Sequence, residues 1–209
     1  MEVPQSWPPT GSRWPGHFPG TGTLAPVTSP YRLPRAVVPH RYTLALEPDL
    51  AGATFTGHVI IDLNVNDPAE QIVLNAIELD IASVKWNGDD VPFSLETATE
   101  RLIVDHAAAV GTGNLEITFS GVLNDKLRGW YRSTYKDADG VEQVIATSQM
   151  QATDCRRAFP CFDEPDFKAV FDITLVIEPH LLAVSNAPRP SASRRTTERS
   201  RSASPRPCP

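Results

Sequence analysis

The sequence has few of the residues that cross-link a chain. It contains three cysteines, Cys155, Cys161 and Cys208, and none of them forms a Cys-x-x-Cys pair. An odd number of thiols without that spacing argues against a disulfide framework and against a zinc ribbon. We therefore expect reduced thiols, no metal site and a cytoplasmic location.

Long apolar runs are also missing. No segment approaches the roughly 18 consecutive apolar residues that a membrane span requires. The N-terminus has no basic head followed by an apolar stretch, which a secretory signal needs. The sequence therefore predicts neither a membrane span nor export.

An excess of positive charge is absent from most of the chain. The formal net charge is −6, yet residues 189–209 contain six Arg and only one Glu, so the remainder is more acidic still. An acidic surface repels the phosphate backbone, which argues against general nucleic-acid binding.

Hydrophobic periodicity is missing at both ends. Residues 1–30 contain seven prolines and scattered aromatics. Such segments bury too little apolar surface to offset their ordering entropy, so we expect disorder in 1–30 and in the Arg/Ser/Pro-rich tail 189–209. The abrupt change at the tail favours a frameshift or aberrant splice over a segment that binds RNA or acidic partners.

Residues 31–188 read as one β domain. No stretch of about ten residues has helical periodicity, whereas apolar and polar residues alternate repeatedly, as in half-buried strands. The alternating apolar sets are Tyr42, Leu44 and Leu46; Val59, Ile61, Leu63 and Val65; and Leu115, Ile117 and Phe119. We predict an all-β, antiparallel fold in sandwich or saddle-like, multi-sheet form.

Turn residues separate these runs. Clusters at 66–68, 87–90 and 111–114 are rich in Asn, Asp, Gly and Pro, which predicts turns between strands. Residues 169–177 are more uniformly apolar, which predicts a central strand buried on both faces.

The stretch 147–165 combines side-chain amides, arginines, carboxylates, prolines and aromatic residues more densely than any other part of the chain. It follows neither strand nor helix periodicity, so we expect an ordered loop. If its start is extended, Gln149 and Gln151 point to the same side and can grip one small polar group together.

Charged residues crowd the second half of this loop. We interpret them as a structural ion-pair network rather than an acid/base site, since adjacent Asp163 and Glu164 would face opposite ways in an extended chain. No histidine partner is placed for Cys155 or Cys161 to act as a nucleophile. The network comprises Asp154, Arg156, Arg157, Asp163 and Glu164.

The sequence Ser-Gln-Met-Gln-Ala-Thr-Asp-Cys-Arg-Arg-Ala-Phe-Pro-Cys-Phe-Asp-Glu-Pro resembles the N-terminal-domain signature of one family of zinc aminopeptidases. That family includes aminopeptidase N, puromycin-sensitive aminopeptidase and leukotriene A4 hydrolase. The resemblance runs in order from about residue 31 to 188. It also covers residues 32–34, 38–42, 123–126, 129–133, 167–175 and 185–186.

The resemblance implies a curved β platform and roles for two glutamines. The position of Gln151, often Glu in the family, binds the free α-amino group of the substrate, and the position of Gln149 lines the pocket for the first side chain. A glutamine that only satisfies loop backbone groups is the alternative for Gln151.

The family's zinc is held by a His-Glu-x-x-His helix and a more distant glutamate, and this chain has no such sequence. We therefore expect no catalytic residue and no cofactor in this chain. The leading hypothesis is the substrate-anchoring N-terminal domain of a zinc aminopeptidase, truncated before the catalytic domain and inactive alone, with peptide N-termini and that domain as partners. The alternative is a non-enzymatic β domain that binds peptide termini or a partner subunit.

Overall fold

The computed structural model describes residues 32–186, and these form an all-β domain, as predicted. Eleven strands lie within them, and their helical content is one 3-10 turn, η1 (Cys155–Arg157). The tails predicted over 1–30 and 189–209, and Cys208 with them, lie outside the described residues.

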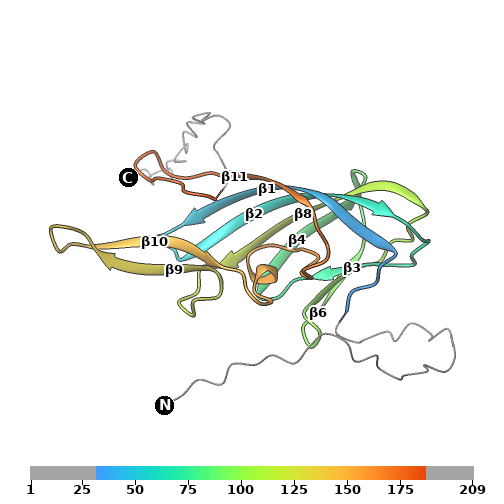
Figure 1. Ribbon diagram of the computed structural model, residues 1–209, viewed down its shortest axis with the longest axis horizontal. Coiled ribbons are helices and arrows are strands. Elements are labelled where there is room, and N and C mark those ends of the chain that lie inside the picture. The colour runs from blue at the N-terminus through green and yellow to red at the C-terminus, as the bar shows by residue number, and fades with distance from the viewer. Residues whose placement is uncertain (1–31, 187–209) are drawn as a thin grey trace, which may run out of the picture. The chain divides into compact units, whose positions relative to one another are not determined.

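The largest sheet has six strands in the order β11-β1-β2-β8-β4-β5 (Figure 1). Its neighbours are antiparallel, except that β11 runs parallel to β1. The strands are β1 (Val37–Asp49), β2 (Thr54–Val65), β4 (Leu79–Trp86), β5 (Asp89–Asp90), β8 (Gly111–Val122) and β11 (Val170–Leu175).

Two smaller sheets complete the fold. One has the order β3-β7-β6, from β3 (Ile72–Asn75), β7 (Arg101–Val104) and β6 (Phe93–Glu96). The other is a ribbon of β9 (Gly129–Lys136) and β10 (Glu142–Gln149). Figure 1 shows this ribbon reaching away from the six-stranded sheet, with η1 following its end.

The core draws on both larger sheets. The alternating apolar residues of β1, β2 and β8 point inward as predicted, and they join one buried cluster with Ile72 and Leu74 of β3 and Leu102 and Val104 of β7. Full burial of one such side chain contributes about 1.5–3 kcal/mol. Tyr42 of β1 and Asn75 of β3 are buried with this core, and both contact the loop described below.

The predicted turn at 87–90 is a two-residue hairpin turn at Asn87 and Gly88. Both have positive φ, 52° and 95°, and Trp86 pairs with Asp89 across the turn. This geometry matches the right-handed twist of the two strands and favours Asn-Gly. Asp89 and Asp90 themselves form β5.

The predicted turn at 111–114 is wrong, because these residues open β8. Gly113 pairs with Leu63 there, and a Cβ on Gly113 would lie 2.3 Å from the ring of Trp86. Glycine at this position lets the indole pack directly on the strand backbone. A residue type typical of turns here serves close packing within a sheet.

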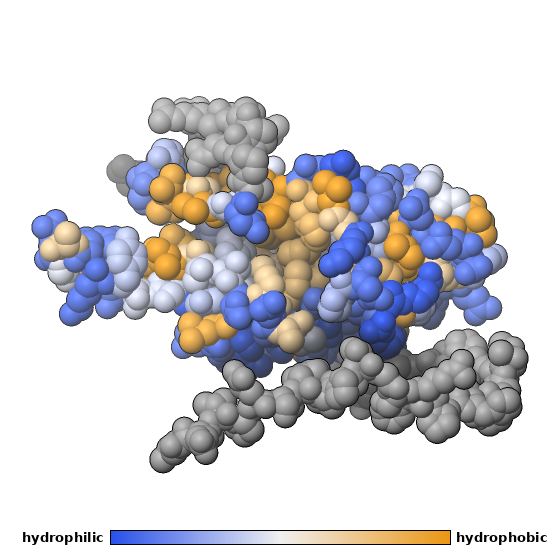
Figure 2. Space-filling view, viewed as in Figure 1, coloured by the Kyte–Doolittle hydropathy of each residue, from blue (hydrophilic) through white to orange (hydrophobic). Residues whose placement is uncertain are grey.

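The prediction of a central strand at 169–177 is also wrong. Strand β11 lies at the edge of the six-stranded sheet, and its side chains are mostly exposed. Val170, Phe171 and Ile173 are all exposed. Figure 2 shows apolar surface on the face where β11 lies in Figure 1. The apolar run therefore marks a partly uncovered edge strand.

Candidate functional site

The loop after β10 begins with the two glutamines singled out from the sequence. Gln149 is the last residue of β10, and Gln151 lies in the turn that follows. Both are exposed, and neither side-chain amide has a hydrogen bond to the residues of 32–186. The extended backbone ends at Gln149, so the two-residue alternation does not continue to Gln151. Their part in binding stays a prediction.

Gly129 sets the position of this loop entrance. It pairs with Gln149 across the ribbon and has φ +66°, which favours glycine. A Cβ there would lie 2.7 Å from Cβ of Arg157 and 3.1 Å from the backbone oxygen of Asp154. Its absence lets the start of β9 lie directly against η1, so the loop keeps a fixed place relative to Gln149.

Arg156 joins η1 to the descending half of the loop. Its Nε donates to Asp163 Oδ2 at 2.9 Å, and its Nη1 donates to Glu100 Oε2 at 3.0 Å. Only 11% of the Arg156 side chain and 12% of the Asp163 side chain are exposed. Because water screens this pair poorly, loss of one partner would leave a buried charge uncompensated.

Arg157 forms a second set of ion pairs. Its Nε donates to Asp154 Oδ1 at 2.8 Å, and its Nη1 lies 2.8 Å from Glu78 Oε2. Burial opposes the charged form, but the hydrogen bonds to Glu78 and Asp154 outweigh it and raise the pKa of Arg157. We call the whole network the arginine clamp, which consists of Glu78, Glu100, Asp154, Arg156, Arg157 and Asp163.

Glu164, which is also expected in this network, contacts two residues that precede β1. Its carboxylate accepts a hydrogen bond from the backbone N–H of Leu33 and pairs with Arg35 Nη2 at 3.0 Å. Arg35 also lies over the ring of Phe167. Glu164 therefore ties the segment before β1 to the end of the loop.

The descending half of the loop is held by backbone hydrogen bonds. Cys161 and Asn75 exchange two of them, at 2.8 and 3.0 Å, and Asn75 Oδ1 accepts from the Asp163 N–H at 3.2 Å. The Phe162 N–H donates to the hydroxyl of Tyr42 at 3.1 Å. Burial raises the pKa of Tyr42 well above its ordinary range. This half of the loop is part of the core.

Three residues of this framework were not found by sequence reasoning. Glu78 and Glu100 complete the arginine clamp from other parts of the chain, and Asn75 fixes Cys161 and Asp163. Glu78 and Glu100 have left-handed backbones, with φ 58° and 56°. Nothing in the sequence pattern marks them, since glutamate is uncommon in that conformation. Only the fold brings them to the loop.

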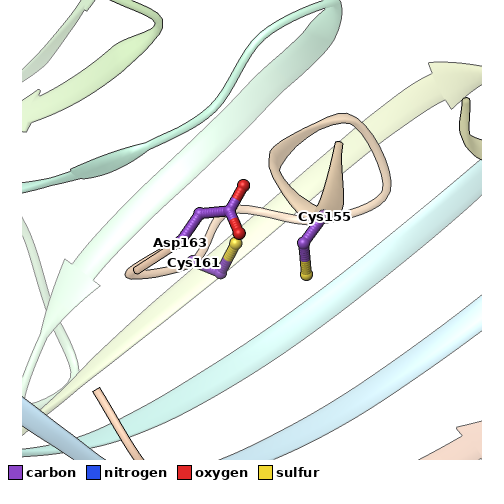
Figure 3. Close-up of side chains that lie close together, drawn as sticks. All are labelled: Cys155, Cys161 and Asp163. Atoms are coloured by element: carbon purple, nitrogen blue, oxygen red, sulfur yellow. The ribbon is translucent and has the colours of Figure 1, made fainter. Parts of the chain in front are cut away.

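The structure also brings together two cysteines that are expected to be reduced thiols outside any metal site. Cys155 of η1, Cys161 and Asp163 place one ligand atom each within 4.8 Å of one another (Figure 3). Cys161 is buried, and burial together with Cys155 raises the pKa of its thiol well above the ordinary value. Five residues lie between them in the chain, a spacing that matches no common cysteine pattern, so their approach is not predictable from the sequence.

The described residues do not fit the zinc site that the resemblance implies. His58 contacts Glu116, His106 packs on Trp86, and His180 contacts Glu178. Within residues 32–186 no histidine joins two further ligating side chains. A His-Glu-x-x-His zinc centre therefore has no counterpart in this part of the chain.

Two shallow depressions lie elsewhere on the domain. They measure about 380 and 390 Å³, and neither is lined by Gln149 or Gln151. Both glutamines thus lie on open surface outside these two hollows. In the part of the chain that the structure describes, no helix has the length and apolar character to cross a membrane.

Comparison with known proteins gives consistent matches. The family model described as the Peptidase M1 N-terminal domain matches residues 38–202. Aminopeptidase 2, mitochondrial, of Saccharomyces cerevisiae is 44% identical over 163 residues, covering 74% of this chain and 17% of that protein. Aminopeptidase M1 of Arabidopsis thaliana is 42% identical over 168 residues, covering 75% of this chain and 19% of that protein.

These matches extend over most of the chain but over less than a fifth of each relative. Aminopeptidase M1-D of Oryza sativa shows the same relation, at 41% identity over 162 residues. The matched region includes every element of the loop and of the arginine clamp. The chain belongs to the M1 aminopeptidase family, of which it contains the N-terminal domain.

Proposed function

We propose that this domain anchors the N-terminus of a peptide substrate for a zinc aminopeptidase. The observation that carries the proposal is the pairing of two exposed glutamines with a loop clamped to the core. Gln149 and Gln151 have amides unengaged by the described residues, while Gly129 and Arg156 hold the surrounding backbone. Groups held in place in this way bind without a large ordering cost.

The chemistry of Gln151 suits a peptide α-amine. Its side-chain oxygen accepts a hydrogen bond from the ammonium, and a bond to a charged group contributes about 1.5–3 kcal/mol. A glutamate at this place would add a full opposite charge. We therefore propose that glutamine holds the amine less tightly than glutamate would, and that Gln149 contacts the first side chain.

Hydrolysis itself is assigned to a catalytic domain with its own zinc ligands. The 209 residues contain no His-Glu-x-x-His sequence, and the described histidines do not gather into a metal site. We expect no turnover when this chain is incubated with zinc and an aminoacyl chromogenic substrate. Turnover that survives purification to homogeneity and disappears with a chelator would contradict this part of the proposal.

A binding experiment tests the anchoring role. A peptide labelled at its C-terminus is titrated with the chain, once with a free N-terminus and once acetylated. Fluorescence anisotropy should show binding of the free amine alone. Gln151→Glu should tighten binding about tenfold, in line with the stronger charged pair. Gln151→Ala should abolish it.

Gln71→Ala is the matched control, since that glutamine bonds to Asp105 outside the loop. It should leave the affinity unchanged. Equal binding of free and acetylated peptides, or equal effects of the Gln151 and Gln71 substitutions, would reject the anchoring role.

A second function, association with a partner protein through β11, is favoured by one specific observation. The edge strand exposes Val170, Phe171 and Ile173 together. Exposed apolar patches at sheet edges favour association. We propose a cytoplasmic location for either function. Size-exclusion chromatography with light scattering tests the association, and Phe171→Lys with Ile173→Lys should abolish it.

A further inference from the structure

The cysteine pair of the loop has a geometry that the anchoring function does not use. Cys155, Cys161 and Asp163 converge so that their ligand atoms lie within 4.8 Å of one another. Figure 3 shows the three side chains arising from η1 and the segment that follows it. In a tetrahedral zinc site, ligand atoms bonded at about 2.0–2.3 Å lie somewhat closer together than this.

We propose that Cys155, Cys161 and Asp163 bind a thiophilic divalent cation such as Zn²⁺, with water as the fourth ligand. Two sulfurs and one carboxylate oxygen form a donor set that zinc accepts in a tetrahedral arrangement. Cys155 is half-buried, so solvent and the ion reach the site from its side. This site is separate from the zinc centre of the family, which needs histidines.

The backbone holds two of the three ligands in place before any ion arrives. Cys161 is fixed by its paired hydrogen bonds with Asn75, and Asp163 by the bond from its N–H to the Asn75 side chain. The carbonyl of Cys155 accepts from the N–H groups of Ala158 and Phe159. A preformed site of this kind needs only small side-chain rotations to close on a metal.

Arg156 orients the carboxylate ligand. Its Nε holds Asp163 Oδ2 at 2.9 Å, which leaves Oδ1 to the cation. A hydrogen bond of this kind to a ligating carboxylate sets its direction, as outer-shell partners do in metal sites. The arginine clamp also places four carboxylates against two guanidinium groups, so its surplus of negative charge attracts a dication.

One feature favours a metal over a disulfide. Asp163 adds a third donor, which a disulfide would not use. Thiols bind zinc as thiolates, so metal binding releases protons and should strengthen as the pH rises.

The test uses the full chain with Cys208→Ser, so that Cys155 and Cys161 are the remaining thiols, under reducing conditions. Titration with Co²⁺ should give thiolate-to-cobalt charge-transfer absorption that saturates at one ion per chain, and Zn²⁺ should displace it. Cys155→Ala should halve the absorption and weaken binding at least about tenfold. Asp163→Asn should weaken binding, and Asp105→Asn, which alters a carboxylate outside the arginine clamp, should not.

The site would be overturned if the reduced, folded chain gave no charge-transfer absorption, or if Cys155→Ala left cobalt binding unchanged. It would also be overturned if peroxide formed a Cys155–Cys161 disulfide in a protein that binds no cobalt when reduced. Because Cys161→Ser can unfold a buried position, the half-buried Cys155 carries the test. Circular dichroism of each variant confirms that it is folded.

Discussion

The loop between β10 and β11 has two halves that differ in how they are held. In the first half, Gln149 and Gln151 are exposed, and their side-chain amides have no bond to the described residues. The second half, from Cys155 to Asp163, is mostly buried and tied by ion pairs and backbone hydrogen bonds. The difference shows how a chain presents adaptable polar groups at a fixed place: the rigid half supplies position and the open half supplies contacts.

The largest effect is expected from the rigid half. Arg156→Met should destabilise the domain by about 4 kcal/mol, because Asp163 is left as a buried charge without its partner. Urea unfolding followed by circular dichroism measures the change. Arg41→Met is the control, since the Arg41–Asp172 pair is largely exposed and should contribute less than about 1 kcal/mol. Equal losses in the two variants would refute a distinct rigid half.

A smaller loss is expected where the ribbon meets η1. Gly129→Ala should cost about 2–3 kcal/mol, since alanine is strained at φ +66° and its Cβ would clash with Arg157. Gly140 has φ +80° but nothing within 4 Å of an added Cβ. Gly140→Ala should therefore lower the free energy of unfolding only through the unfavourable φ, by about 1 kcal/mol. Thermal unfolding of both variants measures the difference. If Gly140→Ala proves as costly as Gly129→Ala, the close contact is not what fixes the loop.

The smallest loss of the series concerns one hydrogen bond. Tyr42→Phe leaves the Phe162 N–H without its acceptor inside the core, which should cost about 1–2 kcal/mol. The exposed Tyr135→Phe should stay within about 0.5 kcal/mol of the parent chain. Amide hydrogen exchange should also show faster exchange at Phe162 in the Tyr42 variant. Unchanged exchange there would mean that the hydroxyl does not hold the loop.

Much of this arrangement is visible in the sequence. Alternation along β1, β2 and β8 predicts the sheet because the side chains of a strand face opposite sides in turn, and burial of one face is then enforced by the core. The pairing of Asp163 with Arg156 also follows from nearness in the chain. Such features depend on residues that are close together in the chain, and their pattern can be read directly from the sequence.

The remainder depends on contacts between distant segments. Glu100 reaches Arg156 across 56 positions, and Asn75 reaches Asp163 across 88. The apolar composition of residues 169–177 predicts a central strand, yet β11 lies at the edge of the sheet. Hydrophobicity alone does not determine whether a strand has a neighbour on each side. The side chains of Cys155 and Cys161 likewise lie close together because the chain turns at η1, and no residue pattern predicts that turn.

The most direct test of the anchoring role observes the side-chain amide of Gln151 itself. In ¹⁵N-labelled protein, its NH₂ resonances are followed by NMR while a dipeptide amide with a free N-terminus is added, and again with the acetylated dipeptide. We expect the Gln151 and Gln149 resonances to shift with the free amine alone, while Cys161 and Phe162 stay in place. Shifts that are equal for both peptides, or that spare Gln151, would contradict the account.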